Sequence, residues 1–462
     1  MATYRTPGVY VEEISTLPPS VAEVATAVPA FIGYTERGPD ATAEPVVLRV
    51  ATMLEFETAF GGAQPVAFTV TQPVDEAGLP TAGPTLAMVA PVRAFSLYYA
   101  LAHYFRNGGG PCHVVSLGNY SATPSADRFA INGLGALEKE DEPTLIVLTD
   151  AACVLSPADY YAVCGAALGQ CRKLGDRFTI IDGAHVDAKV DLEVFRNNSN
   201  LSINLMYGAA YHPYLQTSLA YRYLDAGVGI RRLPPGGKAD AGPAITLADI
   251  KLSDTGLYNQ ARALLDEQRV VLPPSAAMAG IYARVDRERG VWKTPANVGV
   301  MAVLGPVAKI TDDDQDRLNI DPTAGKSINA IRAFTGKGTL VWGGRTLAGN
   351  DNEWRYVSVR RLFITIEENT RKASAFAVFE PNDQATWLKV KAMIESYLYG
   401  LWEQGALAGA KPEAANYVHV GLGSTMTPQD VLDGRMVVEI GVAAVRPAEF
   451  IVLRFSHKLQ TE

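Results

Sequence analysis

Alternating apolar and polar positions mark both ends of this 462-residue chain as extended strands. Near the start, residues 6–14 (TPGVYVEEI) have the composition of a strand, which the double proline Pro18-Pro19 stops. Near the end, residues 449–459 carry apolar side chains at every second position over most of their length. An unpaired strand is a template for pairing with another chain. The two ends therefore predict either strand exchange between subunits or pairing of the ends with each other inside one domain.

The clearest pattern of alternating strands and helices lies in the middle of the chain. Residues 144–149 (TLIVLT) are almost continuously apolar, as expected of a strand in a buried parallel sheet. The tetrad Ser156-Pro157-Ala158-Asp159 predicts the start of a helix that ends at Gly175. Strands are expected at 178–181 and 201–205. This order predicts a mostly parallel sheet with right-handed crossovers.

Other segments also predict helices, strands and loops. The longest helical pattern is 384–404, in which a broad apolar stripe leaves one polar face. We also expect strands at 27–34, 112–117 and 436–445, a helix at 93–105, a surface loop or hairpin at 64–91, and a loop at 231–243.

Composition narrows the class of protein. The chain is 48% hydrophobic and 19% charged, which is typical of a globular protein. Its length predicts two to four domains. Its net charge of -8 argues against a nucleic-acid binder. No run of 18 apolar residues predicts a membrane span, and the first residues lack the apolar core of a signal peptide. The four cysteines show no CxxC spacing and are expected to be free, buried thiols.

The patterns that would indicate catalysis or a cofactor are each incomplete. Residues 324–327 (AGKS) resemble the end of a phosphate-binding loop, but Ile320 stands where the first glycine should be. The six histidines have no metal-ligand spacing. The acidic run 312–316 lacks the glycine and glutamate of a calcium loop, so we expect a solvated or partner-facing loop there. We therefore expect no enzyme activity, cofactor or metal.

Ten short motifs follow one another along nearly the whole chain. They are 7–13 (PGVYVEE), 28–33 (VPAFIG), 105–109 (FRNGG), 273–275 (PPS), 279–286 (AGIYARVD), 290–297 (GVWKTPAN), 327–332 (SINAIR), 341–347 (VWGGRTL), 354–361 (WRYVSVRR) and 447–451 (PAEFI). Together they resemble the sheath proteins of contractile phage tails and of related bacterial contractile injection systems.

The resemblance implies a mixed α/β fold with defined parts. An inner sheath domain would be built from both ends of the chain, and an α/β outer domain would be inserted into it. The expected boundaries are an N-terminal arm at 1–20, the first part of the inner domain at 21–60, a loop or hairpin at 61–92, the outer domain at 93–275, the rest of the inner domain at 276–445, and a C-terminal arm at 446–462.

The resemblance also implies how the subunits would assemble. Sheath subunits stack as six-subunit rings in a helical homopolymer around an inner tube, with baseplate and cap proteins and in some particles sheath paralogues. Each arm would pass to a neighbour and complete a small sheet there. The arm residues expected in these joints are Gly8, Val9, Tyr10, Val11, Glu12, Ile14, Phe450, Ile451, Val452, Leu453, Arg454 and Phe455.

A trigger at the baseplate would let the sheath shorten and drive the tube through a target envelope, without a nucleotide. A single chain favours a phage tail or an extracellular injection particle, because type VI secretion sheaths are split between two smaller proteins. We expect assembly in a bacterial cytoplasm, with no nucleic-acid partner and no membrane insertion. A non-contracting or baseplate-proximal paralogue of the same particle is the alternative.

The polar face of the long helix suggests a surface for the inner tube. Its charged residues Lys389, Lys391 and Glu395 would face the tube if this helix lies in the innermost domain, as the resemblance implies.

Overall fold

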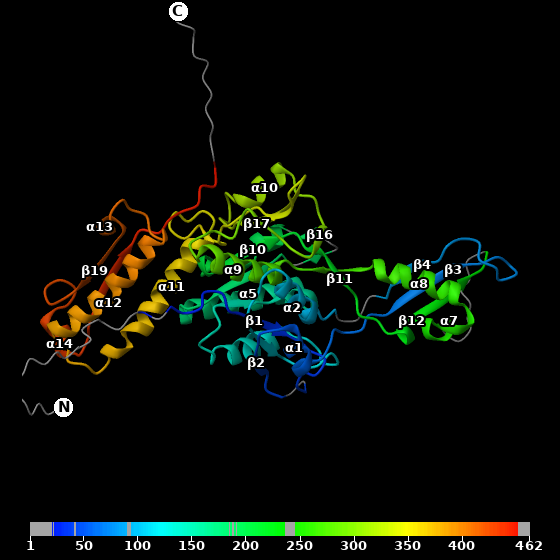
Figure 1. The fold of residues 1–462 in the computed structure, drawn as a ribbon, viewed down its shortest axis with the longest axis horizontal. Helices are drawn as coiled ribbons and strands as arrows, with labels where there is room; N and C mark the ends of the chain where they lie inside the picture. Colours follow the sequence, from blue (N-terminus) through cyan, green and yellow to red (C-terminus); the bar gives the residue numbers. More distant parts are fainter. Residues whose placement is uncertain are drawn as a thin grey trace, which may run out of the picture. The chain divides into compact units, whose positions relative to one another are not determined.

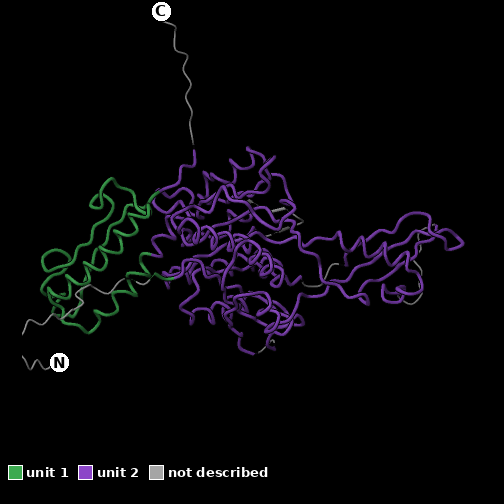
Figure 2. Tube along the Cα trace, viewed as in Figure 1, with its two compact units in different colours: residues 1–24, 366–445 green, residues 25–365, 446–462 purple. Residues whose placement is uncertain are grey.

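The computed structural model describes residues 21, 23–40, 43–89, 94–183, 185–186, 189–190, 192–235 and 245–450. The chain divides into two compact units, drawn in different colours in Figure 2. The first unit contains residues up to Val24 together with 366–445, and the second contains residues 25–365 together with those from Arg446 onward. The division falls inside helix α11 (Val357–Ala373).

A nine-stranded sheet forms the centre of the second unit, in the order β15-β18-β17-β10-β7-β6-β1-β5-β2 (Figure 1). The six strands from β17 to β5 are parallel, and β2, β18 and β15 pair antiparallel at the edges. The mostly parallel sheet expected from the sequence is thus confirmed. The strands are β1 (Pro29–Gly33), β2 (Val46–Val50), β5 (Cys112–Ser116), β6 (Leu145–Val147), β7 (Phe178–Asp182), β10 (Gly208–His212), β15 (Val298–Gly299), β17 (Ile328–Phe334) and β18 (Gly338–Val341).

Helices and aromatic side chains pack against this sheet in one large core. Helix α5 begins where the sequence predicts it, because the Ser156 side chain accepts a hydrogen bond from the Asp159 amide, and it ends at Gly175 in the left-handed conformation. The helices of this part are α1 (Met53–Phe60), α2 (Leu97–Arg106), α3 (Leu134–Leu137), α4 (Thr149–Val154), α5 (Pro157–Leu174), α6 (Leu192–Arg196), α9 (Ser275–Arg289) and α10 (Asp312–Asn319).

Helices α2 and α9 approach each other closely at Gly280. A Cβ atom at this position would lie 2.5 Å from the carbonyl oxygen of Tyr104, so a larger residue would push the helices apart. Asn107, at the C-terminal end of α2, lies at the same contact, because a Cβ at Gly280 would lie 2.9 Å from the Cβ of Asn107. Its side chain donates to the carbonyl of His103 and accepts from the amide of Met301, at 2.9 and 2.8 Å.

Two smaller sheets complete the second unit. One has the order β13-β12-β3-β4 and encloses its own apolar core with helices α7 and α8. Its strands β3 and β4 form the hairpin expected at 64–91. The other is antiparallel, with the order β14-β11-β16. The elements are β3 (Phe68–Pro73), β4 (Thr85–Met88), β12 (Val228–Leu233), β13 (Ile245–Thr246), α7 (Leu247–Ser253), α8 (Thr255–Glu267), β11 (Leu215–Ala220), β14 (Arg269–Leu272) and β16 (Val303–Pro306), with a separate pair β8 (His185–Val186) and β9 (Lys189–Val190).

Three expectations about local structure were wrong. The loop expected at 231–243 does not begin at 231, because strand β12 continues to Leu233 and pairs there with β3. Residues 201–205 form no strand, because 3₁₀ turns occupy 199–201 and 205–207 and Asn204 adopts a left-handed φ of 58°. The acidic run 312–316 is not a loop but the first part of α10, where Thr311 and Asp314 form a capping box. Acidic side chains stabilise this end of a helix, because the N-terminus carries a partial positive charge.

The predicted strand at 144–149 is shorter than expected. Strand β6 ends at Val147, and α4 starts at Thr149. The cysteines are free as predicted. Cys112, Cys164 and Cys171 are buried as expected, whereas Cys153 is only partly buried.

The first unit is built around the long helix α12 (Gln384–Glu403), which confirms the helix expected at 384–404. The Asp383 side chain caps its start by accepting a hydrogen bond from the Thr386 amide. Asn369 of α11 joins two parts of this unit, since its side chain accepts from the amide of Val24 and donates to the hydroxyl of Tyr397. The remaining elements are α13 (Pro412–Ala415), β19 (Asn416–Val420), α14 (Pro428–Leu432) and β20 (Val438–Val442), the last within the predicted strand 436–445.

Two buried carboxyl groups tie the ends of parallel strands to the starts of helices. Asp150, just after β6, accepts hydrogen bonds from the amides of Tyr34 and Ser96. Asp182, the last residue of β7, accepts from the amide and the hydroxyl of Ser275 at the start of α9. Burial raises the pKa of Asp150 to about 6 and that of Asp182 to about 7 despite these hydrogen bonds. Gly33 makes room for Asp150, because a Cβ there would lie 2.6 Å from its carboxyl oxygen.

We predict that Asp182→Asn removes a pH dependence of stability. In the folded chain the carboxyl group holds its proton up to about pH 7, whereas at its ordinary pKa of 3.8 it ionises in the unfolded chain. Its contribution to the free energy of unfolding is therefore fully present below about pH 4 and is lost as the pH rises toward 7. Urea unfolding at several pH values should show the variant gaining stability relative to the wild type over this range.

The control for this experiment is Asp313→Asn, which removes an exposed carboxyl group from α10. A difference between Asp182→Asn and wild type that stays constant from pH 4 to pH 7 would show that Asp182 is ionised in the folded protein throughout.

Candidate assembly surfaces

The predicted arm residues fall almost entirely outside the described part of the chain. Gly8, Val9, Tyr10, Val11, Glu12 and Ile14, and likewise Ile451, Val452, Leu453, Arg454 and Phe455, are not among the described residues. Phe450 is described, and its side chain is exposed. The pairing of both arms with neighbouring subunits therefore stays a prediction.

A two-stranded antiparallel sheet in the first unit offers backbone edges for such pairing. Strands β19 and β20 pair from Asn416 with Val442 to Val420 with Val438, and the described residues add no third strand. A two-stranded sheet alone is of marginal stability in water, and its edges present unpaired backbone groups. Helix α12 packs against β19, and the side chain of Val418 in this strand is buried.

The exposed face of α12 carries the charged residues predicted from the sequence. Lys389 and Glu395 are exposed and Lys391 is partly exposed. Lys391 and Glu395 form an ion pair across one turn of the helix, with 3.7 Å between the charged atoms. The same face exposes the apolar side chains of Leu388 and Tyr399, so it is a mixed rather than a purely charged surface.

Several of the sequence motifs meet in the second unit through paired side chains. Asn329 of motif 327–332 exchanges two hydrogen bonds of 2.8 Å with the backbone of Arg345 in motif 341–347. Thr294 and Ser358, from motifs 290–297 and 354–361, share a hydrogen bond of 2.8 Å between their hydroxyl groups. These four motifs are thus joined in pairs within the second unit.

A buried ion pair joins motif 354–361 to one more motif, 279–286. Arg361 pairs with Asp286, and both side chains are at most 5% exposed. Thr26 completes the site, because its hydroxyl donates to Asp286 and its carbonyl accepts from Arg361. The Arg361 guanidinium also lies over the ring of Tyr282, 4.7 Å from the centroid. Removing either charged partner would leave the other buried and uncompensated, which is strongly destabilising.

A second ion pair holds the chain near the start of the expected C-terminal arm, residues 446–462. The carboxylate of Glu449 accepts two hydrogen bonds from Arg345, of 2.9 Å from Nε and 2.7 Å from Nη2. The side chains of Asn319 and Tyr356 donate to the same carboxylate at 2.9 and 3.1 Å. Burial of Glu449 acts to raise its pKa, but the hydrogen bonds from Arg345 and Asn319 outweigh it and hold the pKa below its usual range.

Sequence reasoning quoted Arg345 and Glu449 in separate motifs but did not pair them. They lie 104 positions apart, and no local periodicity connects residues at such a separation. The sequence signal for this ion pair was that Arg345 and Glu449 are each the charged residue of a short, otherwise mostly apolar motif.

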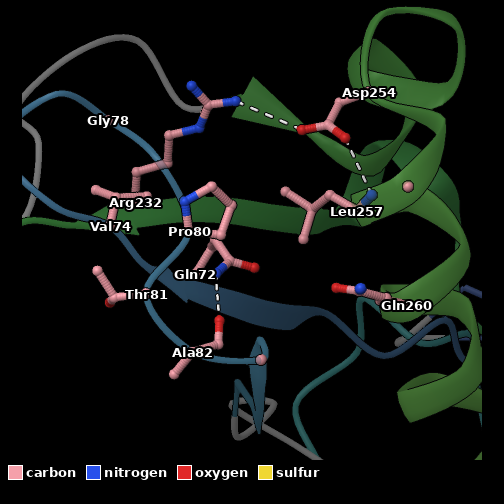
Figure 3. Close-up of a pocket in the computed structure, with 12 residues that line it drawn as sticks. Gln72, Val74, Gly78, Pro80, Thr81, Ala82, Arg232, Asp254, Leu257 and Gln260 are labelled. Carbon is pink, nitrogen blue, oxygen red and sulfur yellow. Dashed lines mark hydrogen bonds and ion pairs between the residues drawn. The ribbon is translucent and has the colours of Figure 1, made fainter.

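A cavity of about 580 Å³ lies beside the β13-β12-β3-β4 sheet, between the β3–β4 hairpin and the start of α8 (Figure 3). The side chains of Asp254, Arg232 and Gln72 in its lining make contacts within the fold. Asp254 accepts from the amide of Leu257 to cap α8 and lies 3.6 Å from Arg232, while Gln72 donates to the carbonyl of Ala82. The residues described in its lining include no histidine, cysteine or serine that could act as a nucleophile or base.

Within the described ranges, no three histidine, cysteine, aspartate or glutamate side chains gather as a metal site requires. The described helices also include none with the length and apolar character needed to cross a bilayer.

Comparison with known proteins identifies relatives over part and over all of the chain. Residues 349–458 match the family described as the phage tail sheath C-terminal domain. A tail sheath protein of Burkholderia phage BcepMu is 32% identical over 144 residues, which are 30% of this chain and 30% of the relative. The chain spans only about a quarter to a third of the length of the curated phage relatives that it matches.

Solved structures match over the full length. The sheath complex of an extracellular contractile injection system, PVC, in its contracted state is 30% identical, with 99% of both chains covered and a TM-score of 0.66. A chain in the baseplate of the anti-feeding prophage is 31% identical, with 99% of this chain and all of that chain covered and the same TM-score. Likeness of this extent and identity means that the chain belongs to the sheath protein family of contractile phage tails and contractile injection systems.

Proposed function

We propose that this chain is the sheath subunit of a contractile particle, and that it polymerises as stacked six-subunit rings around an inner tube. Contraction of the sheath would drive the tube through a target envelope. The observation that carries this proposal is the full-length likeness to a sheath complex in its contracted state. The described structure supports this proposal, because the side chains of the motifs bind one another and stabilise the fold.

The joints of the polymer would be strands exchanged between subunits. The acceptor we propose is the β19–β20 sheet, which has two strands among the described residues, and the donors are residues 8–14 and 450–459 of neighbouring chains. Each donated strand would add about four to six backbone hydrogen bonds, worth roughly 1 kcal/mol each. Each subunit would donate two strands and receive two, so the joints would hold the polymer by their number.

Contraction would need an extended state that is metastable relative to the contracted one, so that shortening is downhill once triggered. In this proposal the strand joints persist while the compact units between them move. Pro18-Pro19 and Arg446-Pro447 would be the hinges, and the expected inner and outer domains remain part of the proposal.

The partners we propose are the chain itself, an inner tube protein, and baseplate and cap proteins, with assembly in a bacterial cytoplasm before release as a tail or an extracellular particle. A baseplate-proximal sheath paralogue is the second candidate, which the likeness to a chain of the anti-feeding prophage baseplate favours. Copy number per particle, measured by quantitative mass spectrometry, separates the two, because only the main sheath subunit repeats along the whole tail.

Deleting an arm should abolish polymers while leaving the subunit folded. We expect negative-stain electron microscopy to show tubes for the full chain and none for variants lacking residues 1–17 or 451–462, because each deletion removes one donated strand. Circular dichroism of the two variants serves as the folding control. Tubes formed by both truncated variants would contradict strand exchange through the arms.

Reversing the charges on the exposed face of α12 should weaken binding to the inner tube. The variant Lys389→Glu/Lys391→Glu/Glu395→Lys keeps an ion pair of opposite sign between positions 391 and 395, so the helix should fold normally. Lys251→Glu in α7 is the matched control, since it changes the net charge by the same amount at an exposed site. We expect co-purification with the tube protein to fall several-fold for the first variant and to stay unchanged for the control. Equal recovery of tube protein with both variants would exclude this face of α12 as the tube surface.

A further inference from the structure

The carboxylate of Glu449 sits in a site made by three separate segments. Arg345 follows β18, Asn319 ends α10, and Tyr356 comes directly before α11. All of them donate to Glu449, so each carboxylate oxygen accepts two hydrogen bonds. We call Glu449 and these three donors the Glu449 clamp.

The donors are held in place by contacts of their own. The guanidinium of Arg345 is only 4% exposed, and its remaining nitrogen Nη1 donates to the carbonyls of Asn319 and Gly349, at 3.3 and 3.4 Å. Asn329 fixes the Arg345 backbone, as described above. Because the donors are positioned by the scaffold, binding Glu449 costs little further ordering on their side.

Glu449 lies just after the point where the chain passes from the first compact unit to the second. Residues 366–445 belong to the first compact unit, and the chain returns to the second unit at Arg446. Between Val442, which ends β20, and Phe450 there is no further strand. Glu449 is therefore the side chain that attaches this returning segment to the second unit by a bidentate ion pair.

We propose that the Glu449 clamp is the anchor of the C-terminal arm, and that Arg345, Asn319 and Tyr356 are positioning residues for the joint between subunits. The inference rests on the proposed function, since it assumes that residues 451–459 are donated to a neighbour. A strand that starts from a fixed point reaches its acceptor with a higher effective concentration than one on a loose tether. Because the clamp holds Glu449, the donated strand can leave the subunit only from Phe450 onward.

The experiment compares the full-length chain with Glu449→Ala and Tyr356→Phe. Hydrogen exchange with mass spectrometry measures the attachment of residues 446–450, and sedimentation measures the protein concentration at which half of the chain is in sheaths. For Glu449→Ala we expect faster exchange confined to the peptide containing residues 446–450. We also expect a rise of about tenfold in that concentration, because charge-assisted hydrogen bonds to the anchor are lost. Tyr356→Phe removes one hydrogen bond and should have a smaller effect in the same direction.

Two further chains make the result specific. Glu267→Gln removes an exposed charge at the end of α8 and should behave as wild type. A chain lacking residues 451–462 gives the value for loss of the donated strand beyond the clamp. A purely structural role for Glu449 would lower thermal stability and raise exchange throughout the second unit. That pattern would overturn the anchor.

The remaining outcomes separate the two proposals. If wild type and Glu449→Ala form sheaths at the same concentration, the anchor is excluded while the sheath function stands. If wild type forms no sheaths under conditions where the inner tube protein is also present, the proposed function fails. The exchange of residues 446–450 then still decides the clamp, because unchanged exchange in Glu449→Ala means that Glu449 does not hold this segment.

Discussion

Burial of the parallel sheet on both faces is the constraint on which the rest of the second unit depends. Every residue of β1, β5, β6 and β7 is buried. Backbone groups and side chains at the ends of such strands lose contact with water, so the protein must supply their partners. Asp150 and Asp182 do this by accepting hydrogen bonds from the amides that begin α2 and α9. The strand ends where many α/β proteins bind ligands thus serve here to fix helices.

The residues of the sequence motifs fit the same logic. Arg361 and Asp286, Asn329 and Arg345, and Thr294 and Ser358 each join motifs that are distant in sequence. In a subunit whose proposed work is mechanical, rigid connections inside a compact unit let movement be confined to the segments between units. This accounts for distinctive motifs whose side chains bind one another.

Local signals in the sequence predicted local structure well. The caps of α5 and the start of α12 were predictable because a capping side chain and the amide it satisfies are only three residues apart. The strand expected at 201–205 failed because Asn204 adopts a left-handed conformation that alternation of side chains does not reveal. The acidic run was misread because a capping box, and not charge density, decides the structure of 312–316. The Glu449 clamp lay beyond sequence reasoning, since three distant segments have to fold before its geometry exists.

The shortness of β19 and β20 has a consequence for the fidelity of assembly. Each strand has five residues, so either edge of this sheet can hold an incoming strand by only a few hydrogen bonds. For a subunit that assembles as proposed, a strand inserted out of register would also place its apolar side chains on the wrong face. Such a mistake would dissociate before the next layer covers it. Weak individual joints would therefore give a growing sheath the chance to correct errors, which a long and tightly held strand would not allow.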